Sequence, residues 1–531
     1  FWSQLAAMWN KFLEGARLPA VLTEVRTIGV PKDDGGQRPI SLAQVLWRLA
    51  NTVVVDKLPT WVDQWTPEEL CGGLRGRSAE TIYVALEAAL TSAHRTGETF
   101  SACKEDVRRA FPSIRIPIGL HVLKKYGLPQ GLADYVQGFY DQLEHSFEAS
   151  GAVAARNTSP EVGGLQGCPL TCLIMGAIMS VWVMAMKEVP DVETKVFVDD
   201  RIVTTTSQSP DETLAAASVK SGEVDAVLGL ERHPDKRQAA SSSRKGRRLL
   251  RKEAGLLGPA RDGLEILGVL HFFGRRRLRA FKPAKLERAT RRLKRIAMVS
   301  RSCWRRRKLV RQLALPIVTW QGAWTQPAKT KFHSLRMAVE RTILGKITEG
   351  RSRFLAWTAD PLLGPEVDPS FQYDLGALRH EVWRARRRLV GDPLRGLADA
   401  PKRMREVAAA WGWQELGPGR WTTPEGELHF GWDGWGTIQA AAEAAWKRQL
   451  WAAEPQVTPE EADLAGEPRV EPLTEEHRTW LAAAQPPRAP ERRTALAAGM
   501  DGRVLSELRE KKEGTWDKKN PPTPVACSCA T

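Results

Sequence analysis

Carboxylates give this sequence its sharpest chemical signal. Asp199 and Asp200 are adjacent in the stretch Phe197-Val198-Asp199-Asp200, at the expected tip of a β-hairpin. Two neighbouring carboxylates at a tight turn repel each other, and a divalent cation would remove that cost and favour the charged forms. The four residues alone are more typical of a solvated turn. A third aspartate, Asp106, lies on a separate strand-like stretch and strengthens the interpretation as a metal site.

The elements that must position these carboxylates alternate irregularly along the chain. Apolar alternation predicts a strand near 99–107 and a hairpin over 194–206. A helix is predicted from Ser209-Pro210 to Gly229, because proline suits a first turn and glycine a C-terminus. Helical stripes also cover 1–14 and about 42–58, on either side of a strand over 25–30 and a turn-prone run over 30–39. This irregular order indicates an α+β fold class rather than a doubly wound parallel sheet.

One long apolar run, over residues 170–186, requires a choice between a membrane span and a core helix. It is slightly short for a bilayer-spanning helix of roughly 20 residues, so we predict a buried core helix and no membrane partner. The seven cysteines are too sparse for a disulfide scaffold, which favours a reducing compartment, nucleus or cytoplasm, over secretion. The chain begins with Phe1 rather than Met and is interpreted as a fragment of a longer product.

Charge and composition limit the classes of partner that this chain is expected to bind. The chain has 531 residues, 42% of them hydrophobic, so it can bury a sizeable core and is not disordered throughout. Its formal net charge is +16, which suits a polyanionic partner such as nucleic acid or an acidic membrane surface. Residues 231–310 hold 26 Lys or Arg against 6 Asp or Glu, so this segment carries more positive charge than the whole chain.

Several blocks around the aspartates occur in a recognisable order. From the N-terminus they are Val30-Pro-Lys followed by Arg38-Pro-Ile-Ser-Leu42, Gly73-Leu-Arg-Gly-Arg-Ser78, Cys103-Lys-Glu-Asp-Val-Arg-Arg-Ala-Phe-Pro112, Gly164-Leu-Gln-Gly-Cys-Pro-Leu170, Phe197-Val198-Asp199-Asp200, Gly229-Leu followed by Asp235-Lys236, and Leu267-Gly268-Val269. In this order they resemble the fingers and palm of reverse transcriptases, most closely those of non-LTR (LINE-like) retrotransposons, over roughly residues 20–345. The resemblance implies a right-hand polymerase with fingers, a palm built on an antiparallel sheet, and a helical thumb.

The resemblance implies a role for each matching residue. Asp106, Asp199 and Asp200 would hold two Mg²⁺ ions, or Mn²⁺ in their place, with help from the backbone carbonyl of Val107. Lys236 would protonate the leaving pyrophosphate. The nucleotide-binding residues would be Lys32 and Arg38 on the triphosphate, Phe111 as a steric gate against a ribose 2′-hydroxyl, and Gln166 and Gly167 in a loop that the nucleotide and template approach.

Arginine-rich stretches are the candidate nucleic-acid contacts. Arg75 and Arg77 belong to the block that resembles the family's template-contacting motif, and Leu267-Gly268-Val269 resembles its primer grip. The other candidates are Arg275, Arg276, Arg277, Arg305, Arg306, Arg307 and Lys308 in the expected thumb. A charge run of this kind is usually a solvated helix face, but directly after a palm it is expected to follow the phosphates of the template–primer.

The resemblance and the composition together divide the chain into four parts: fingers and palm over 1–275, a basic helical thumb over 276–350, a Trp-rich accessory region over 351–453, and over 454–531 a linker and the start of a further region. The five tryptophans over 411–435 are expected to form the core of a small domain, with base stacking as the alternative. Cys527 and Cys529 lack partners for a zinc site.

The function implied is RNA-directed DNA polymerisation, with an RNA template, a DNA primer and deoxynucleotides as partners. Two alternatives stay open. One is a catalytically inactive or co-opted nucleic-acid-binding relative that retains the shape of the palm. The other is a reverse transcriptase of the group II intron maturase type, although the Trp-rich tail does not obviously match a maturase domain. Arg108-Arg109, Pro112, Cys168 and Val198 depart from the family's usual residues, and none of them removes a metal ligand.

Overall fold

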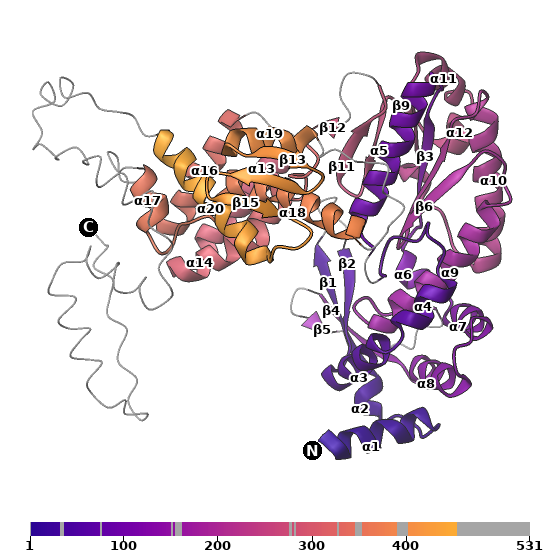
Figure 1. Ribbon diagram of the computed structural model, residues 1–531. Helices are drawn as coiled ribbons and strands as arrows, with labels where there is room; N and C mark the ends of the chain where they lie inside the picture. Colours follow the sequence, from indigo (N-terminus) through magenta and orange to yellow (C-terminus); the bar gives the residue numbers. More distant parts are fainter. Residues whose placement is uncertain are drawn as a thin grey trace, which may run out of the picture. The chain divides into compact units, whose positions relative to one another are not determined.

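The computed structural model describes residues 2–31, 37–74, 77–149, 152–153, 162–274, 279–280, 283–325, 329–345, 353–389 and 402–453 (Figure 1). The chain divides into two compact units. The first unit comprises Phe1–Ala284, Gln321–Ala328 and Arg387–Arg403, and the second comprises Lys285–Trp320, Lys329–Arg386 and Met404–Thr531. The predicted α+β class is confirmed, because both units combine helices with small sheets.

The helices of the first unit are α1 Trp2–Leu13, α2 Ala20–Thr23, α3 Val45–Asp56, α4 Pro59–Trp65, α5 Ala79–Thr96, α6 Ala110–Ser113, α7 Ile116–Lys125, α8 Gln130–Asp141, α9 Pro169–Met186, α10 Pro210–Leu228, the 3₁₀ turn η1 Pro234–Lys236, α11 Arg244–Leu250 and α12 Ala254–Leu257. Its strands are β1 Glu24–Pro31, β2 Gln37–Leu42, β3 Ser101–Asp106, β4 Glu144–Ala149, β5 Ala152–Val153, β6 Glu193–Phe197, β7 Asp200–Thr205, β8 Gln238–Ser241, β9 Ala260–Arg261, β10 Gly263–Ile266, β11 Val269–Phe272 and β12 Arg279–Ala280.

Three sheets order these strands. The largest runs β6-β7-β3-β8-β9, with β3 in the middle and antiparallel to both β7 and β8, while the short β9 pairs with β8 in parallel. A second sheet, β2-β1-β4-β5, combines antiparallel hairpins with one parallel pair, β1 and β4. The third, β10-β11-β12, turns at Leu267 and Gly268, whose φ angles are positive, and the Tyr83 hydroxyl donates to the carbonyl of Leu267.

Helix α9 is the apolar run that raised the question of a membrane span. It is long and apolar enough for one, but two-thirds of its residues are buried inside the protein, as predicted for a core helix. Its packing is close: a Cβ on Gly119 of α7 would lie 2.3 Å from the Ile174 side chain of α9. Trp182, near its C-terminal end, is fully buried.

Helix α3 forms where the apolar stripe predicts it, but the stripe does not face the core. Val45, Leu49 and Val53 are exposed, whereas Trp47 and Asn51 are fully buried. Trp47 stacks on Phe139 of α8, with ring centroids 3.6 Å apart, so one large aromatic ring on the opposite face decides which side of α3 packs inward.

The second unit is mainly helical. Its elements are α13 Pro283–Val299, α14 Cys303–Leu309, the π-turn η2 Val310–Ala314, α15 Leu315–Thr319, α16 Lys329–Leu344, α17 Arg353–Ala359, α18 Pro369–Leu389, α19 Lys402–Trp411, the antiparallel strands β13 Gln414–Gly417, β14 Arg420–Thr423 and β15 Gly426–His429, and α20 Trp435–Ala452. Helix α16 buries Phe332, Leu335, Val339 and Ile343 at helical spacing.

A buried aspartate and several tryptophans organise this unit. Asp368 is fully buried before α18, accepts a hydrogen bond from Trp446 Nε1 at 2.7 Å and pairs with Arg336. Trp411, Trp413 and Trp421 are buried, as predicted for a small core, while Trp432 is 73% exposed. The expected thumb helices and the Trp-rich segment lie in one unit, so the boundary at residue 350 stays a prediction, as does the four-part division.

Candidate active site

The three aspartates come from two neighbouring strands of the largest sheet. Asp106 ends β3, and Asp200 begins β7 directly opposite it in the antiparallel register. Asp199 occupies the turn between β6 and β7, next to the Phe197–Asp200 pair that closes this hairpin. The structure therefore places the turn where alternation predicts it, and brings the third carboxylate from a strand that precedes β7 by about 100 residues.

The turn that carries Asp199 is held from outside the hairpin. Val198 has φ 59°, a left-handed conformation that is unfavourable for a β-branched residue. The segment from Glu69 to Gly72 runs beside β6, where Cys71 N donates to the Val196 carbonyl at 2.7 Å. A Cβ on Gly72 would fall 2.4 Å from the backbone nitrogen of Val198, so only glycine fits against this turn.

Two lysines neutralise two of the carboxylates. Lys236 Nζ lies 2.5 Å from Asp106 Oδ2, and Lys104 Nζ lies 2.9 Å from Asp200 Oδ1. Burial, and then the charges of Asp200 and Asp106, raise the pKa of Asp199 to about 6. A cation bound beside these carboxylates would offset both the cost of burial and the repulsion between the like charges.

The chain after α10 delivers Lys236 to this place. The backbone of β3 extends by one bridge, Val107 to Arg232, in which Arg108 N donates to Glu231 O and His233 N donates to Asp106 O. These two bonds do not use the carbonyl of Val107, which is the group expected to assist the metal. The turn η1 then brings Lys236 back to Asp106.

Phe111 and the loop with Gln166 are connected through the backbone. Gly164 N donates to the Phe111 carbonyl at 2.7 Å, and Gly163 N donates to the Ile114 carbonyl at 2.9 Å. A Cβ on Gly164 would lie 2.3 Å from the Thr171 side chain, which explains this glycine. Phe111 is half-buried against the hydrophobic core, Gln166 is half-buried, and Gly167 is exposed with φ 101°.

Several predicted residues lie outside the described residues, namely Lys32, Arg75, Arg275, Arg276 and Arg277. The backbone of Arg38 is described and pairs with Val30 in the β1–β2 hairpin. The contacts predicted for these side chains with the triphosphate and with nucleic acid stay predictions.

The remaining arginines differ in how much of their donor capacity the fold uses. Arg77 donates to the carbonyls of Pro67 and Leu70 at 2.5 and 2.8 Å, so it closes the loop beside the hairpin. Arg306 donates to the carbonyls of Ser300 and Ala297, and Arg307 pairs with Glu366 at 2.8 Å. Arg305 and Lys308 are exposed. The structure thus divides the predicted basic run into two side chains facing solvent and two that hold the fold.

The residues fit a divalent cation by the chemistry of their donors. Asp106, Asp199, Asp200 and the Val107 carbonyl offer the hard oxygen ligands that Mg²⁺ prefers. Burial first, and then the charges of Asp200 and Asp106, raise the pKa of Asp199. Among the described residues, however, no three His, Cys, Asp or Glu side chains are arranged as a metal cluster.

Sequence reasoning missed three features of the site. Lys104 was not predicted as the partner of Asp200, although it lies two residues before Asp106 and therefore on the same face of β3. Gly72 was not predicted because its role depends on a distant turn. A buried ion pair between Glu105 and Arg201, on the opposite face, had no local signal beyond two charges next to the aspartates.

Known proteins provide an independent comparison. Residues 30–270 match the family described as "Reverse transcriptase (RNA-dependent DNA polymerase)". This range includes all three aspartates, Lys236, Arg38, Phe111 and the loop with Gln166 and Gly167. Residues 30–270 therefore form a reverse transcriptase domain, as the order of the sequence blocks predicts.

Within this class, the domain is distantly similar to Pol polyproteins of R2 non-LTR retrotransposons. It is 27% identical over 175 residues to the polyprotein of the type-2 element R2DM of Drosophila melanogaster, and 22% identical over 180 residues to that of the type-1 element R2 of Popillia japonica. The matches cover 32% and 33% of this chain, but only 16% and 25% of the two polyproteins.

Similar solved structures include telomerases. The apo telomerase of Candida tropicalis is 12% identical with a TM-score of 0.37, and the match covers 65% of this chain and 66% of the telomerase. The telomerase of Candida albicans with a fragment of telomeric RNA is 11% identical with a TM-score of 0.35, and the match covers 65% and 63%.

Proposed function

We propose that this chain is an RNA-directed DNA polymerase that adds deoxynucleotides to a primer 3′-hydroxyl. The observation that carries the proposal is the pairing of Asp106 with Asp200 across β3 and β7, with Asp199 beside them in the turn. In the reaction, the primer 3′-hydroxyl loses its proton to solvent and its oxygen forms a bond to the α-phosphorus. The bond from that phosphorus to the bridging oxygen breaks, and pyrophosphate leaves.

Each residue has a part in this proposal. Asp106, Asp199, Asp200 and the Val107 carbonyl would hold two Mg²⁺ ions, or Mn²⁺, which would supply activation of the 3′-hydroxyl and neutralisation of the triphosphate. Lys236 carries a proton at Nζ for the pyrophosphate. Lys32 and Arg38 grip the triphosphate, Phe111 excludes a ribose 2′-hydroxyl, and Gln166 and Gly167 line the approach of nucleotide and template.

The partners follow from the charge. An RNA template and a DNA primer are polyanions, and the basic segment over 231–310 supplies the cations to hold them. The five cysteines of the described part are free, which is consistent with a reducing compartment. We infer that the protein works in the nucleus or cytoplasm.

A second function, nucleic-acid binding without catalysis, is favoured by one observation. Lys236 pairs with Asp106 and Lys104 with Asp200, so side chains of the protein itself neutralise two of the three carboxylates. This alternative predicts salt-dependent binding of template–primer and no extension.

Primer extension separates the two functions. The wild-type protein is incubated with an RNA template, a DNA primer, deoxynucleotides and Mg²⁺. We expect extension, and we expect Asp199→Ala and Asp200→Ala to slow it by about a thousandfold or more. Both variants should bind template–primer with wild-type affinity, because phosphate contacts supply most of that affinity. A folded wild-type protein that binds but never extends would support the non-catalytic function.

A further inference from the structure

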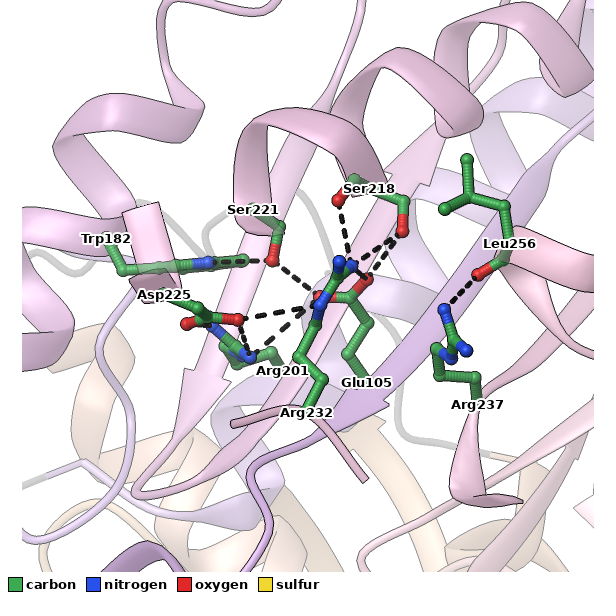
Figure 2. Close-up of polar contacts among 9 residues, drawn as sticks. All are labelled: Glu105, Trp182, Arg201, Ser218, Ser221, Asp225, Arg232, Arg237 and Leu256. Carbon is green, nitrogen blue, oxygen red and sulfur yellow. Dashed lines mark hydrogen bonds and ion pairs between the residues drawn. The ribbon is translucent and has the colours of Figure 1, made fainter. Parts of the chain in front are cut away.

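A buried network of four charges lies beneath the candidate active site, and the proposed function does not use it. Its members are Glu105 of β3, Arg201 of β7, Asp225 of α10 and Arg232 of the segment after α10 (Figure 2). Glu105, Arg201 and Asp225 are at most 3% exposed. Two acids and two bases make the network neutral. We call it the Glu105–Arg201 network.

Arg201 and Asp225 form its strongest pair. The two terminal nitrogens of Arg201 donate to the two carboxylate oxygens of Asp225 at 2.7 and 2.8 Å, a two-pronged geometry that sets orientation as well as distance. The guanidinium also lies over the Trp182 ring, 4.9 Å from its centroid. Burial opposes its charge, but the hydrogen bonds and charges of Asp225, with that of Glu105, outweigh burial and raise the pKa of Arg201.

Glu105 is held by two serines and an arginine. Ser218 and Ser221 of α10 donate to its two oxygens at 3.0 and 2.6 Å, and Ser221 in turn accepts from Trp182 Nε1. Arg232 Nη1 donates to the same carboxylate at 3.0 Å. Figure 2 shows these groups converging from the sheet, from α10 and from the segment after it.

Arg232 can reach Glu105 because helix α10 has a glycine, and no side chain, where the guanidinium passes it. A Cβ on Gly222 would lie 2.5 Å from the Arg232 guanidinium, so the glycine makes the space. Arg232 also donates to the Ser218 carbonyl at 2.8 Å. Its backbone forms the bridge to Val107, and four residues later Lys236 contacts Asp106.

The network and the carboxylates occupy opposite faces of the same two strands. Successive side chains of a strand point to opposite faces, and Glu105 faces Arg201 in the register step next to the Asp106–Asp200 pair. Two of the network's charges are thus one residue from a candidate catalytic carboxylate, and Arg232 lies in the segment that delivers Lys236. A slip of one residue in the register between β3 and β7 would break the network and would at the same time move Asp106 away from Asp200.

Stability alone does not explain such a network. Well-packed apolar side chains of similar volume are often as stabilising as a buried ion pair, or more so, whereas the ion pair demands one geometry. Substitution of groups that orient metal ligands without touching the metal typically lowers metal affinity or activity by about 10–100-fold.

The structure assigns to Glu105, Arg201, Asp225 and Arg232 the role of positioning residues, which hold Asp106, Asp199 and Asp200 in the geometry that binds metal and reacts. This inference rests on the proposed function, because it supposes that the aspartates are catalytic. It adds residues that touch neither metal nor substrate.

Arg201→Lys is the first test, because it keeps the charge and removes the two-pronged contact. The matched control is Arg336→Lys in the second unit, where Arg336 likewise pairs with a buried aspartate, Asp368, at 2.7 Å and lies over the ring of Trp357. Both variants should lower Tm. We expect Arg201→Lys to lower kcat about 10–100-fold and to weaken Mn²⁺ binding to the metal-free protein to a similar degree. KM for deoxynucleotides should stay near wild type, and Arg336→Lys should keep both kcat and Mn²⁺ affinity.

A second variant removes the charges altogether. Glu105→Leu, Arg201→Met, Asp225→Leu and Arg232→Met are combined, so that no charge of the network stays buried without its partner. We expect a folded protein with a Tm near or above wild type, yet with the same loss of kcat and Mn²⁺ affinity. Wild-type kcat and Mn²⁺ affinity in either folded variant would overturn the inference. Failure of both to fold would make the network purely structural and would overturn it as well.

Mn²⁺ binding also separates this inference from the proposed function. Electron paramagnetic resonance measures it without any polymerisation. If the wild-type protein extends no primer, the proposed function fails, while loss of Mn²⁺ affinity in Arg201→Lys still tests the positioning role. If the wild-type protein extends primers and Arg201→Lys does so equally well, only the inference fails.

Discussion

The three aspartates of the site differ in their electrostatic surroundings. Asp106 and Asp200 each have a lysine within 3 Å, whereas Asp199 stands in the turn with two carboxylates near it. Its pKa is raised to about 6, first by burial and then by Asp200 and Asp106. Asp199 is therefore a carboxylate whose ionisation the folded protein opposes, and a bound cation would reduce that cost.

This difference predicts the effect of Asp199→Asn on stability. A carboxyl whose folded pKa lies above its ordinary value of 3.8 makes the fold less stable as pH rises from about 4 through 6. In metal-free buffer at pH 7.5, the variant should therefore be more stable than wild type, by about 1–3 kcal/mol. The difference in the free energy of unfolding between the variant and the wild-type protein should become smaller towards pH 4. Urea unfolding at several pH values measures it.

Magnesium provides the control for Asp199→Asn. Added Mg²⁺ should stabilise the wild-type protein more than the variant, because it removes the repulsion that the variant lacks. A variant that is less stable than wild type at pH 7.5 in the presence of a chelator would show that the folded protein does not oppose the ionisation of Asp199.

Phe111 predicts sugar selectivity. It lies half-buried beside the core, and its backbone is tied to the Gly163–Gly164 loop, so Phe111→Ala should cost about 1–3 kcal/mol of stability. If the ring is also the steric gate, the variant should incorporate ribonucleotides more readily relative to deoxynucleotides. The ratio of kcat/KM for the two sugars reports this directly. An unchanged ratio in a folded variant would leave Phe111 with a packing role only.

At the scale of elements, the aspartate hairpin depends on a segment outside its own sheet. Glu69 to Gly72 lines the outer side of β6, and Arg77 closes this segment by donating to the carbonyls of Pro67 and Leu70. Val198, whose backbone is left-handed, therefore lies against the backbone of this segment at Gly72. The geometry of the turn is set by the fold around it rather than by its own residues.

Gly72→Ala tests that dependence. The added Cβ would lie 2.4 Å from Val198 N, so the turn must move, and we expect a cost of about 1–3 kcal/mol together with a loss of kcat. Gly176→Ala in α9 is the matched control, because a Cβ there meets nothing within 4 Å. This control should gain about 0.5–1 kcal/mol from helix propensity. Thermal unfolding and primer extension are measured on both variants, and equal behaviour of the two would contradict the assigned contact.

Across the whole molecule, positive charge is concentrated between residues 231 and 310. Part of this charge holds the second unit together, since Arg306 and Arg307 of α14 bind carbonyls and Glu366. Arg305 and Lys308 on the same helix face solvent. Only charges of the second kind are available to phosphates.

Two double variants separate these kinds of charge. Arg305→Ala with Lys308→Ala should keep Tm and should reduce the slope of log affinity against log salt by about 0.7–0.9 for each phosphate that the protein no longer neutralises. Arg306→Ala with Arg307→Ala should instead lower Tm. Fluorescence anisotropy with template–primer across a salt series measures the slope. An unchanged slope in the first double variant would mean that its two side chains form only a solvated face.

Local patterns predicted the elements that are local in origin. The hairpin over Glu193–Thr205, the core helix α9 and the helix that ends at Gly229 all follow from spacing within about 20 residues. That Asp106 acts together with Asp199 and Asp200 was expected only from a resemblance. The register that pairs Asp106 with Asp200 comes from the structure, since no local pattern encodes the register of strands so far apart. The contact of Lys104 with Asp200, the role of Gly72 and the inward face of α3 depend on contacts across the fold, and the sequence alone did not predict them.

The order of strands in the largest sheet has a consequence for how the chain is made. Strand β3 lies between β7 and β8, and its two neighbours are completed only at Thr205 and Ser241. A ribosome adding about 5–20 residues per second needs roughly 5–20 s to pass from Asp106 to Thr205. During that time the nascent β3 has both edges open, which is the condition under which strands pair wrongly. The strand that supplies the first aspartate is thus open to wrong pairing until β7 and β8 have been made.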